Sequence, residues 1–315
     1  MATVTARPLS MAGVARAARR SYGAAREIPV VPLAILGLLA AVAVFAPVLA
    51  PHDKLDPVKP TREACLAKYG IPSCPYIDTV PPFWSSAGTR DTPLGTDSLG
   101  RDVLSRLMHG ARISLVVALT GTLAAGVIGT LLGVLAGYLG GWWDQIIMRV
   151  TDAWLTLPSL VFAILLSSVR GPGLWNVVLI LALVFWSRYA RAVRGEVLGV
   201  RERDFVRLAE LSGVKPFRII RRHLLPNVMN TVMVLFSLQV GVAVIIEASL
   251  SFLGVGVPPP EPSWGLMMAQ ERETFMVGSW WLAVFPGICI SMLVLSANML
   301  GDWLRVRLDP QLRNR

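Results

Sequence analysis

Few side chains in this sequence could do chemistry, and none are grouped as catalysis or metal binding requires. The histidines and cysteines are scattered: His52, His109, His223, Cys65, Cys74 and Cys289. They form no CxxC pair and no Cys/His cluster, which argues against a zinc site. The pattern GxxxxGK[ST] is absent and no lysine follows a glycine, so the chain lacks a Walker-type phosphate cradle. Without a nucleophile–base constellation either, the sequence predicts neither an enzyme nor a bound cofactor or metal.

One acidic side chain, Glu247, lies well inside an apolar run. Acids inside a membrane are costly and are functional candidates by default. Glu247 is expected toward the outer end of its span, where water or a polar partner can reach it. Two interpretations stay open: a structural anchor, or a residue of a translocation path.

The elements that carry these residues are strongly apolar. The chain has 315 residues, of which 54% are hydrophobic and 16% charged, and its mean hydropathy is +0.58. This composition indicates several membrane spans. The net charge of +10 comes with no nucleic-acid motif, and basic residues collect on the cytoplasmic side of membrane proteins. We therefore expect an all-α polytopic membrane protein with no nucleic-acid partner.

The polar stretch 201–227, RERDFVRLAELSGVKPFRIIRRHLLPN, separates two apolar runs. It predicts two short helices joined by a sharp turn. Asp204 can cap the first helix, Gly213 suits a left-handed residue after its end, and Pro216 can open the second helix. Pro226 is expected to end the second helix.

Each of these two helices has an apolar face. The first face is expected to consist of Phe205, Leu208, Ala209 and Ser212. The second is expected to consist of Phe217, Ile220 and Leu224, opposite Arg218, Arg221 and Arg222.

This stretch resembles the "EAA" loop of permease subunits in ABC importers: small residues on a helix, then a glycine, then Ile and Leu-Pro about a dozen residues on. Three other blocks resemble the C-type permease of dipeptide and oligopeptide importers: TPLGTDSLGRDVLSRLMHGARISL, FLGVGVPPPEPSWGLMM and NMLGDWLRVRLDPQLR. The resemblance covers nearly the whole chain after residue 28. It implies an ABC type-1 importer permease fold of six transmembrane helices, with a five-helix core and an N-terminal span.

In that family the loop is cytoplasmic and docks into a groove on the ATPase subunit. The resemblance implies these docking residues: Phe205, Arg207, Leu208, Ala209, Glu210, Gly213, Arg218 and Pro226. The family usually has Glu-Ala-Ala where this chain has Arg207, Leu208 and Ala209, and often Arg in place of Glu210. The charge pair is therefore reversed. An arginine facing the positive end of the helix costs about 0.3–1 kcal/mol.

The apolar runs predict spans at about 28–50, 113–138, 153–169, 174–186, 228–252 and 280–299. The first is too long and starts too late for a signal peptide, although Val48-Leu49-Ala50 resembles a cleavage site. Residues 103–111 are expected to lie at the membrane surface. Pro158 is expected to break the third span, and Trp264 to anchor at the interface.

Two local patterns predict packing. Small residues recur every four positions in the second span: Gly121, Ala125, Gly129, Gly133 and Gly137. Such a stripe lets another helix approach closely; a ligand path beside the glycines is the alternative. In the segment after this span, Asp144, Arg149 and Asp152 suggest a structural elbow in which Arg149 and Asp152 pair at i, i+3.

The distribution of Lys and Arg predicts the orientation. Most of them fall in the tail 1–27, the loop 201–227 and the C-terminal tail 303–315, which we expect to be cytoplasmic. Residues 51–109 then form an extracytoplasmic loop with an interfacial helix, and residues 110–302 the permease domain. Cys65 and Cys74 would lie outside the cytoplasm, where a disulfide persists; two free thiols are the alternative.

The resemblance implies a permease subunit of an ATP-driven importer in the bacterial inner membrane, carrying di- or oligopeptides. It also implies a homologous second permease, two ATPase subunits that bind the ATP and Mg, and an extracytoplasmic peptide-binding protein. One alternative is the same architecture with nickel chelates, glutathione or sugars as cargo. A more distant one is an ion-coupled secondary transporter, for which inverted repeats and charged midmembrane helices are expected.

Overall fold

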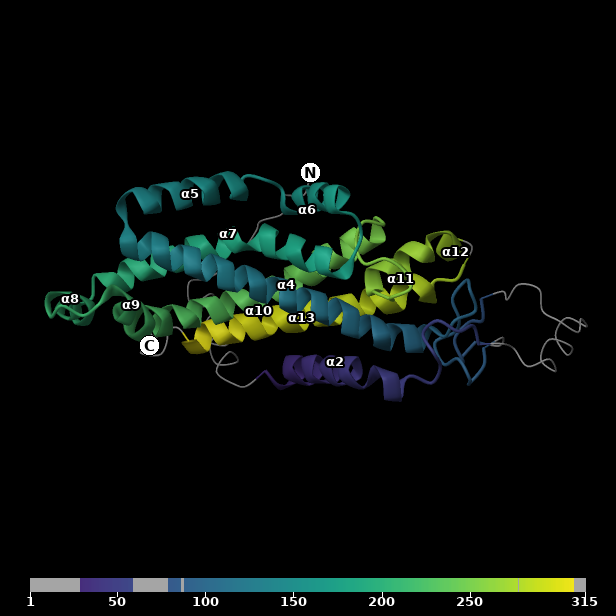
Figure 1. The fold of residues 1–315 in the computed structure, drawn as a ribbon. Coiled ribbons are helices and arrows are strands. Elements are labelled where there is room, and N and C mark those ends of the chain that lie inside the picture. Colours follow the sequence, from purple (N-terminus) through teal and green to yellow (C-terminus); the bar gives the residue numbers. More distant parts are fainter. Residues whose placement is uncertain (1–28, 59–78, 86–87, 277, 309–315) are drawn as a thin grey trace, which may run out of the picture.

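The computed structural model describes residues 29–58, 79–85, 88–276 and 278–308, and these residues fold into an elongated bundle of helices (Figure 1). Within them the only β-structure is a pair of isolated bridges, Pro57 with Arg101 and Thr96 with Asp102. Cys65 and Cys74 fall outside the described residues. The all-α architecture that the composition predicts is confirmed.

Five helices are long and apolar enough to cross a membrane. They are α2 (Val30–Leu49), α4 (Val103–Leu139), α7 (Leu174–Arg201), the run Pro216–Phe252 that contains α10 (Leu225–Phe252), and α13 (Trp281–Leu308). The helices α5 (Gly141–Leu155) and α6 (Ser159–Arg170) meet at a bend of 93° and supply a sixth span if the pair counts as one. The expected six spans are therefore reached only with this bent pair.

The helix α4 corrects the expectation of a separate interfacial helix over 103–111. Asp102 caps its start by accepting a hydrogen bond from the Ser105 amide at 2.8 Å, and α4 then runs unbroken for 37 residues. It ends at Gly140, whose φ is +67°. No proline interrupts the segment. At about 1.5 Å per residue the helix exceeds the hydrocarbon thickness, so one rod replaces the surface helix and the second span.

Other boundaries also differ from the apolar runs. The bent pair of α5 and α6 begins at Gly141, well before the third span expected from residue 153, although the break before Ser159 lies where Pro158 predicts it. The helices α7 and α13 continue to Arg201 and Leu308, beyond the expected ends at 186 and 299. The reason is that hydropathy indicates which residues a bilayer would cover, whereas a helix can continue beyond the bilayer as long as its backbone hydrogen bonds are made.

The stripe of small residues in α4 packs directly against α7, as predicted. A Cβ atom built on Gly129 would lie 2.3 Å from the Trp186 carbonyl oxygen, and one on Gly133 would lie 2.6 Å from the Ala190 oxygen. Only glycine allows the two backbones to approach this closely. The stripe therefore forms a helix–helix contact.

The pair expected between Arg149 and Asp152 is absent. Asp152 instead binds Arg191, and Asp144 binds Arg194 with a 2.6 Å contact between Oδ2 and Nη2. Both acids of α5 therefore face α7, because α5 lies alongside that helix (Figure 1). Tertiary pairing across two helices replaces the local i, i+3 pair.

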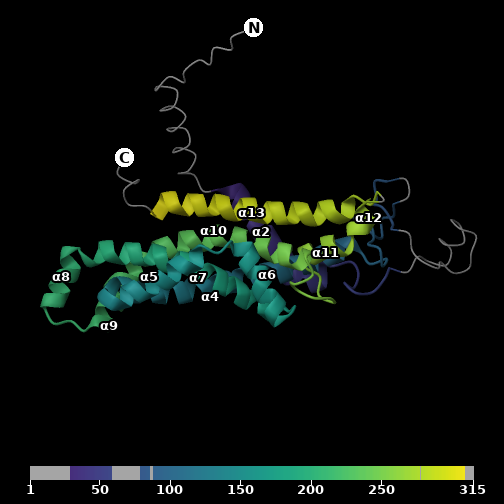
Figure 2. The ribbon, with the colours of Figure 1, turned by 90° about the horizontal axis from the view of Figure 1, so that it is seen from above.

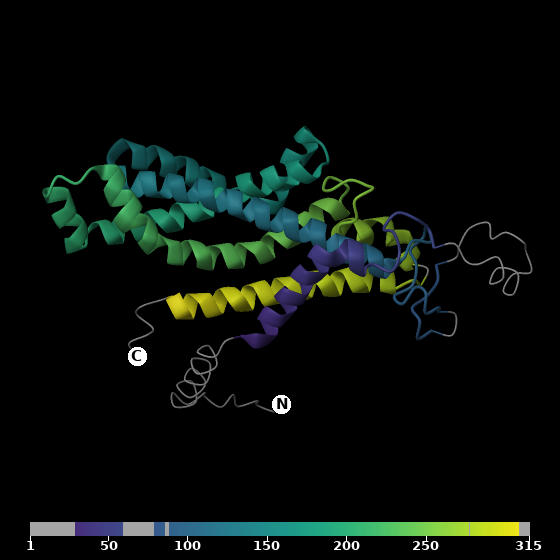
Figure 3. The same cartoon turned by 60° about the horizontal axis from the view of Figure 1, so that its bottom comes forward.

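The two ends of the bundle are different in kind. The short helices α8 (Asp204–Leu211) and α9 (Pro216–Ile219) project at one end, and α11 (Trp264–Gln270) and α12 (Arg272–Met276) lie at the other (Figures 1 and 2). The N-terminal span α2 crosses α13 obliquely and packs on α4 and α13 (Figure 3).

Trp264 does not anchor at a surface, which corrects the sequence-based expectation. The side chain is fully buried, and its Nε1 donates to the Leu107 carbonyl oxygen at 3.1 Å. The ring packs on Gly110, where an added Cβ would lie 2.9 Å from it. Trp264 thus fixes α11 on α4, because a glycine in α4 leaves room for the indole.

A buried ionic network at the same end was not anticipated. Asp97 accepts from Arg101 at 2.7 Å and lies 3.4 Å from the Arg106 Nε atom. Glu271 accepts from the Ser98 hydroxyl at 2.7 Å. These contacts tie the segment before α4 to the turn between α11 and α12. Their sequence signal was a charged cluster in the block TPLGTDSLGRD.

Candidate functional site

The segment between α7 and α10 forms a compact hairpin at one end of the bundle. Gly213 has a φ of +72°, and its amide donates to the Glu210 oxygen at 3.0 Å. The Val214 amide donates to the Ala209 oxygen at 3.1 Å. Together these bonds make a complete Schellman motif, in which only glycine takes the left-handed position without strain. The sharp turn predicted at Gly213 is therefore present.

The outer face of α8 is apolar and exposed. Phe205 is 41% exposed and Leu208 62% exposed, whereas Ala209 is half-buried. Together Phe205 and Leu208 form an exposed apolar face on this short projecting helix (Figure 1). The inner contact is made by Val206, which is fully buried in a small cluster with Ile219. The sequence pattern did not single out Val206, because it predicted a single apolar face of Phe205, Leu208, Ala209 and Ser212 for this helix.

The start of α8 differs from the expected cap. Asp204 is the first helical residue, and Arg203 holds the N-cap position with no side-chain hydrogen bond. Arg207 and Glu210 are both exposed, and neither takes part in an ion pair within the described chain. Arg207 is thus open to solvent, whereas Glu210 lies beside the Tyr138 side chain at the end of α4.

The second half of the hairpin is basic on its outer side. A recess of about 470 Å³ is lined by Phe217, Arg218, Arg221 and Arg222. Phe217 is exposed, and the buried apolar positions are Ile219 and Leu224. The expected inner face of Phe217, Ile220 and Leu224 is therefore rotated, and Phe217 belongs with the arginines.

Pro226 does not end a helix, contrary to the expectation. A π-helical turn, Ile220–Leu224, precedes α10, and the Leu225 amide bonds to the Ile220 oxygen. A wider turn of this kind accommodates a proline, which has no amide hydrogen to donate to the i→i−4 hydrogen bonds of an α-helix. The Asn227 side chain donates to the His223 oxygen at 2.7 Å. The hairpin is thus rigidly continuous with α10.

Glu247 in α10 is completely buried and fully engaged. Its two carboxylate oxygens accept from the Ser114 and Ser251 hydroxyls, each at 2.9 Å. Ser114 belongs to α4, so the carboxylate joins α4 to α10. The Ser251 hydroxyl in turn accepts from the Val257 amide at 3.2 Å. The interpretation as a structural anchor is supported, because a buried polar group with partners on both sides ties two helices together.

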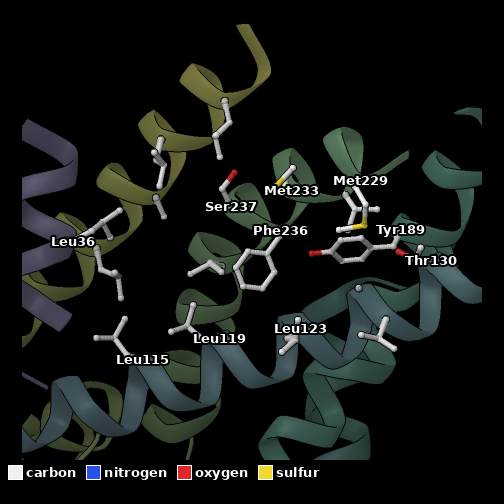
Figure 4. Close-up of a pocket in the computed structure, with 18 of the residues that line it drawn as sticks. Leu36, Leu115, Leu119, Leu123, Thr130, Tyr189, Met229, Met233, Phe236 and Ser237 are labelled. Carbon is white, nitrogen blue, oxygen red and sulfur yellow. The ribbon is translucent and has the colours of Figure 1, made fainter. Parts of the chain in front are cut away.

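Two cavities of about 670 Å³ each flank α10. The first lies between α2, α4, α10 and α13 and is lined almost entirely by apolar side chains, as Figure 4 shows for Leu119, Met233 and Phe236. Such a lining suits hydrocarbon and rejects a charged solute. Tyr189 and Thr130 also border it (Figure 4).

The second cavity, called the polar cavity below, lies beside the hairpin and has a mixed lining. Its charged, amide and hydroxyl side chains come from α7, α10, α13 and the turn before α8: Glu196, Arg203, Asn227, Asn230, Thr231 and Arg305. Its apolar side chains are Val234, Leu235, Leu238 and Leu308. A solute with both charges finds partners here. The described residues contain no cluster of His, Cys, Asp or Glu suited to a metal ion.

The fold and the hairpin define a helical membrane permease, and comparison with known proteins agrees. The family model "Binding-protein-dependent transport system inner membrane component" matches residues 129–314. The di/tripeptide transport system permease DppC of Pseudomonas aeruginosa is 39% identical, with 86% of this chain and 84% of the relative covered. The dipeptide permease DppC of Bacillus subtilis is 40% identical over 89% of this chain and 81% of its own.

Two further similarities bear on cargo and fold. The glutathione permease GsiD of Pectobacterium atrosepticum is 41% identical, with 70% of this chain and 73% of the relative covered. The inward-facing MetNI methionine ABC transporter matches with a TM-score of 0.55 at 16% identity, over 65% of this chain and 97% of that one. This structural match supports the fold alone.

The chain belongs to the binding-protein-dependent transport system inner membrane component family. It is a multi-pass inner-membrane permease subunit of an ABC importer. It binds no cofactor of its own, ATP hydrolysis takes place in partner subunits, and a binding protein delivers the solute. The resemblance drawn from the hairpin and the other three blocks is confirmed.

Proposed function

We propose that this chain forms half of a translocation pathway for di- or oligopeptides. Residues 110–302 act as the permease domain beside a homologous second permease, with two ATPase subunits on the cytoplasmic side. The substrate class rests on relatives near 40% identity that are named for di- and tripeptide transport. The polar cavity, with acidic and basic side chains, has the chemistry that a zwitterionic peptide requires.

The hairpin 201–227 is the proposed site of ATPase docking, and the observation that carries this is the exposed apolar face on α8. Phe205 and Leu208 form its centre, Arg207 and Glu210 flank it, and the arginines around Phe217 form a polar fringe. Because the π-turn joins the hairpin to α10 without a break, movement of α8 would be transmitted to a membrane-spanning helix. In this arrangement both termini lie in the cytoplasm and residues 51–109 outside it.

Replacement of Gly213 by leucine tests the docking role. A Cβ at its φ of +72° costs about 1–2 kcal/mol and turns α8 away from its position. We expect normal membrane levels, weak ATPase co-purification and little peptide uptake. Gly254→Leu is the matched control, because Gly254 has a φ of +79°, equally open surroundings and the same pair of Schellman hydrogen bonds, and it lies at the end of α10 away from the hairpin. ATPase capture by Gly213→Leu at wild-type strength would show that the hairpin does not dock the ATPase.

Glutathione is the second candidate cargo, because a glutathione permease is 41% identical to this chain. Glutathione is itself a tripeptide, so the same pathway chemistry would serve both. Uptake of a labelled dipeptide by the complete transporter, in competition with unlabelled glutathione, separates the two. Strong competition by glutathione at equal concentration would assign it as the preferred cargo.

A further inference from the structure

The central helix α7 carries three arginines on successive turns, and one of them lacks an acidic partner. Arg194 binds Asp144 and Arg191 binds Asp152. Arg188 donates instead to the Gln239 Oε1 atom and to the Ser159 hydroxyl, each at 3.1 Å. No acid of the described chain lies within salt-bridge distance of it. Since guanidinium is always charged, a cation here is balanced only by neutral groups.

The position of Arg188 makes this charge costly. It lies about 21 Å along α7 from the first residue, Leu174, at about 1.5 Å per residue. The apolar run of α7 ends near residue 186, so Arg188 lies just past that run on the hairpin side and is partly buried there. A partly desolvated charge usually has a partner of opposite charge.

Gln239 adds a donor that has nothing to bind. Gln239 is only 5% exposed, and its Nε2 atom has no hydrogen-bond partner among the residues that the structure describes. Arginine can only donate, which fixes the Gln239 oxygen toward Arg188. The free NH₂ therefore lies on the same amide, beside the guanidinium. The Arg188 guanidinium and the free Gln239 amide are both hydrogen-bond donors. Together they would bind a group that accepts hydrogen bonds and carries negative charge.

The third component is the start of α6. Ser159 is the first residue of α6, directly after the 93° bend, and no side chain caps this end. The first amides of a helix have no partner within the helix, and they carry the positive end of its dipole. Broken membrane helices present such ends to anionic solutes in other transporter folds. All three components therefore favour the same kind of group.

Access to this position is through Arg188 itself, because Arg188 and Gln239 line neither of the two cavities. The polar cavity follows α10 from Asn227 to Leu238, and Leu238 packs on the α13 side. Arg188 itself is partly exposed. The apolar cavity, by contrast, offers no partner for a charge.

We propose that Arg188, Gln239 and the first turn of α6 bind the C-terminal carboxylate of the peptide in transit. The carboxylate accepts from the guanidinium, from the free Gln239 amide and from the first α6 amides. This inference rests on the proposed peptide-import function and adds the residues that recognise one end of the substrate. The ion pairs at Arg191 and Arg194 hold α5 against α7, and leave Arg188 available.

Binding of two probes to the purified complete transporter, without its binding protein, tests the proposal. The probes are the dipeptide Ala-Phe and Ala-Phe amide, which lacks the carboxylate, titrated into the millimolar range. Hydrogen bonds to charged groups are the stronger class, and we expect the free carboxylate to bind at least about tenfold more tightly. Arg188→Gln removes the cation. Gln239→Glu keeps the shape of the side chain but places a carboxylate against Arg188. This carboxylate of the protein would then take the place of the peptide carboxylate.

Both variants are expected to lose the preference for Ala-Phe over its amide. Arg191→Gln, the same substitution one turn along α7, is expected to keep it. The proposal is overturned if the wild type binds Ala-Phe no more tightly than its amide, or if Arg188→Gln and Gln239→Glu retain the preference for Ala-Phe. It is also overturned if both variants fail to assemble with the ATPase, because the cluster would then be structural. Dipeptide uptake by the wild-type transporter is measured separately: its absence would refute the proposed function, whereas uptake without a carboxylate preference would refute this inference alone.

Discussion

The contact between α4 and α7 gives the sharpest test of the architecture, through the substitution Gly129→Ala. The added Cβ would lie 2.3 Å from the Trp186 oxygen and 2.5 Å from the Tyr189 Cβ atom. Carbon atoms in contact need about 3.5–4.0 Å. The two helices must therefore separate by about 1 Å, because the obstacles are the backbone and first side-chain atom of a long helix.

The expected change in the free energy of unfolding is the sum of two opposing effects. Overpacking of this kind costs about 1–3 kcal/mol, while replacing glycine with alanine inside a helix gains up to about 1 kcal/mol. Gly195→Ala isolates the clash, because Gly195 is also helical but has no atom within 4 Å of its built Cβ. The propensity gain is common to both variants. The difference in unfolding free energy between them should therefore be about 1–3 kcal/mol, with Gly129→Ala the less stable.

Thermal unfolding of the purified transporter in detergent, followed by tryptophan fluorescence, measures this difference. We expect Gly129→Ala to unfold several degrees below Gly195→Ala at equal ATPase content. If Gly129→Ala unfolds at the same temperature as Gly195→Ala or higher, the close approach of α4 and α7 is wrong.

Substitutions at two further positions, Glu247 and Asp97, test buried polar groups. Glu247→Gln should lower the free energy of unfolding by less than about 1 kcal/mol and keep uptake, because an amide still bonds both serines. Glu247→Leu should lower it by about 1–3 kcal/mol for each serine left unpaired. Altered uptake by a normally assembled Glu247→Gln transporter would favour a role in the pathway instead. Asp97→Asn should cost about 3–5 kcal/mol, since it leaves Arg101 and Arg106 buried without their acid. Its control, Glu261→Gln, removes the more exposed pair with Lys54 and should cost about 0–1 kcal/mol. Equal thermal shifts for Asp97→Asn and Glu261→Gln would show that the Asp97 network does not stabilise this end of the bundle.

The sequence determined the class of protein and the turn at the hairpin, because both depend on local properties. Hydropathy requires no knowledge of neighbours, and Gly213 followed by Pro216 constrains the backbone wherever the segment lies. The stripe at every fourth position in 121–137 also indicated close helix packing, since that spacing places the small residues on one face. Four motif blocks then sufficed to indicate the family.

The tertiary structure decided everything that depends on which helix lies next to which. The sequence placed Arg149 with Asp152 because they are neighbours on one helix, but α5 lies beside α7 and its acids find arginines there. It placed Trp264 at a surface because tryptophan favours interfaces, but Gly110 leaves a space that the indole fills. Nothing in the sequence indicates that Arg188 differs from Arg191 and Arg194, because only the assembled bundle shows that the latter two have acidic partners whereas Arg188 has none among the described residues.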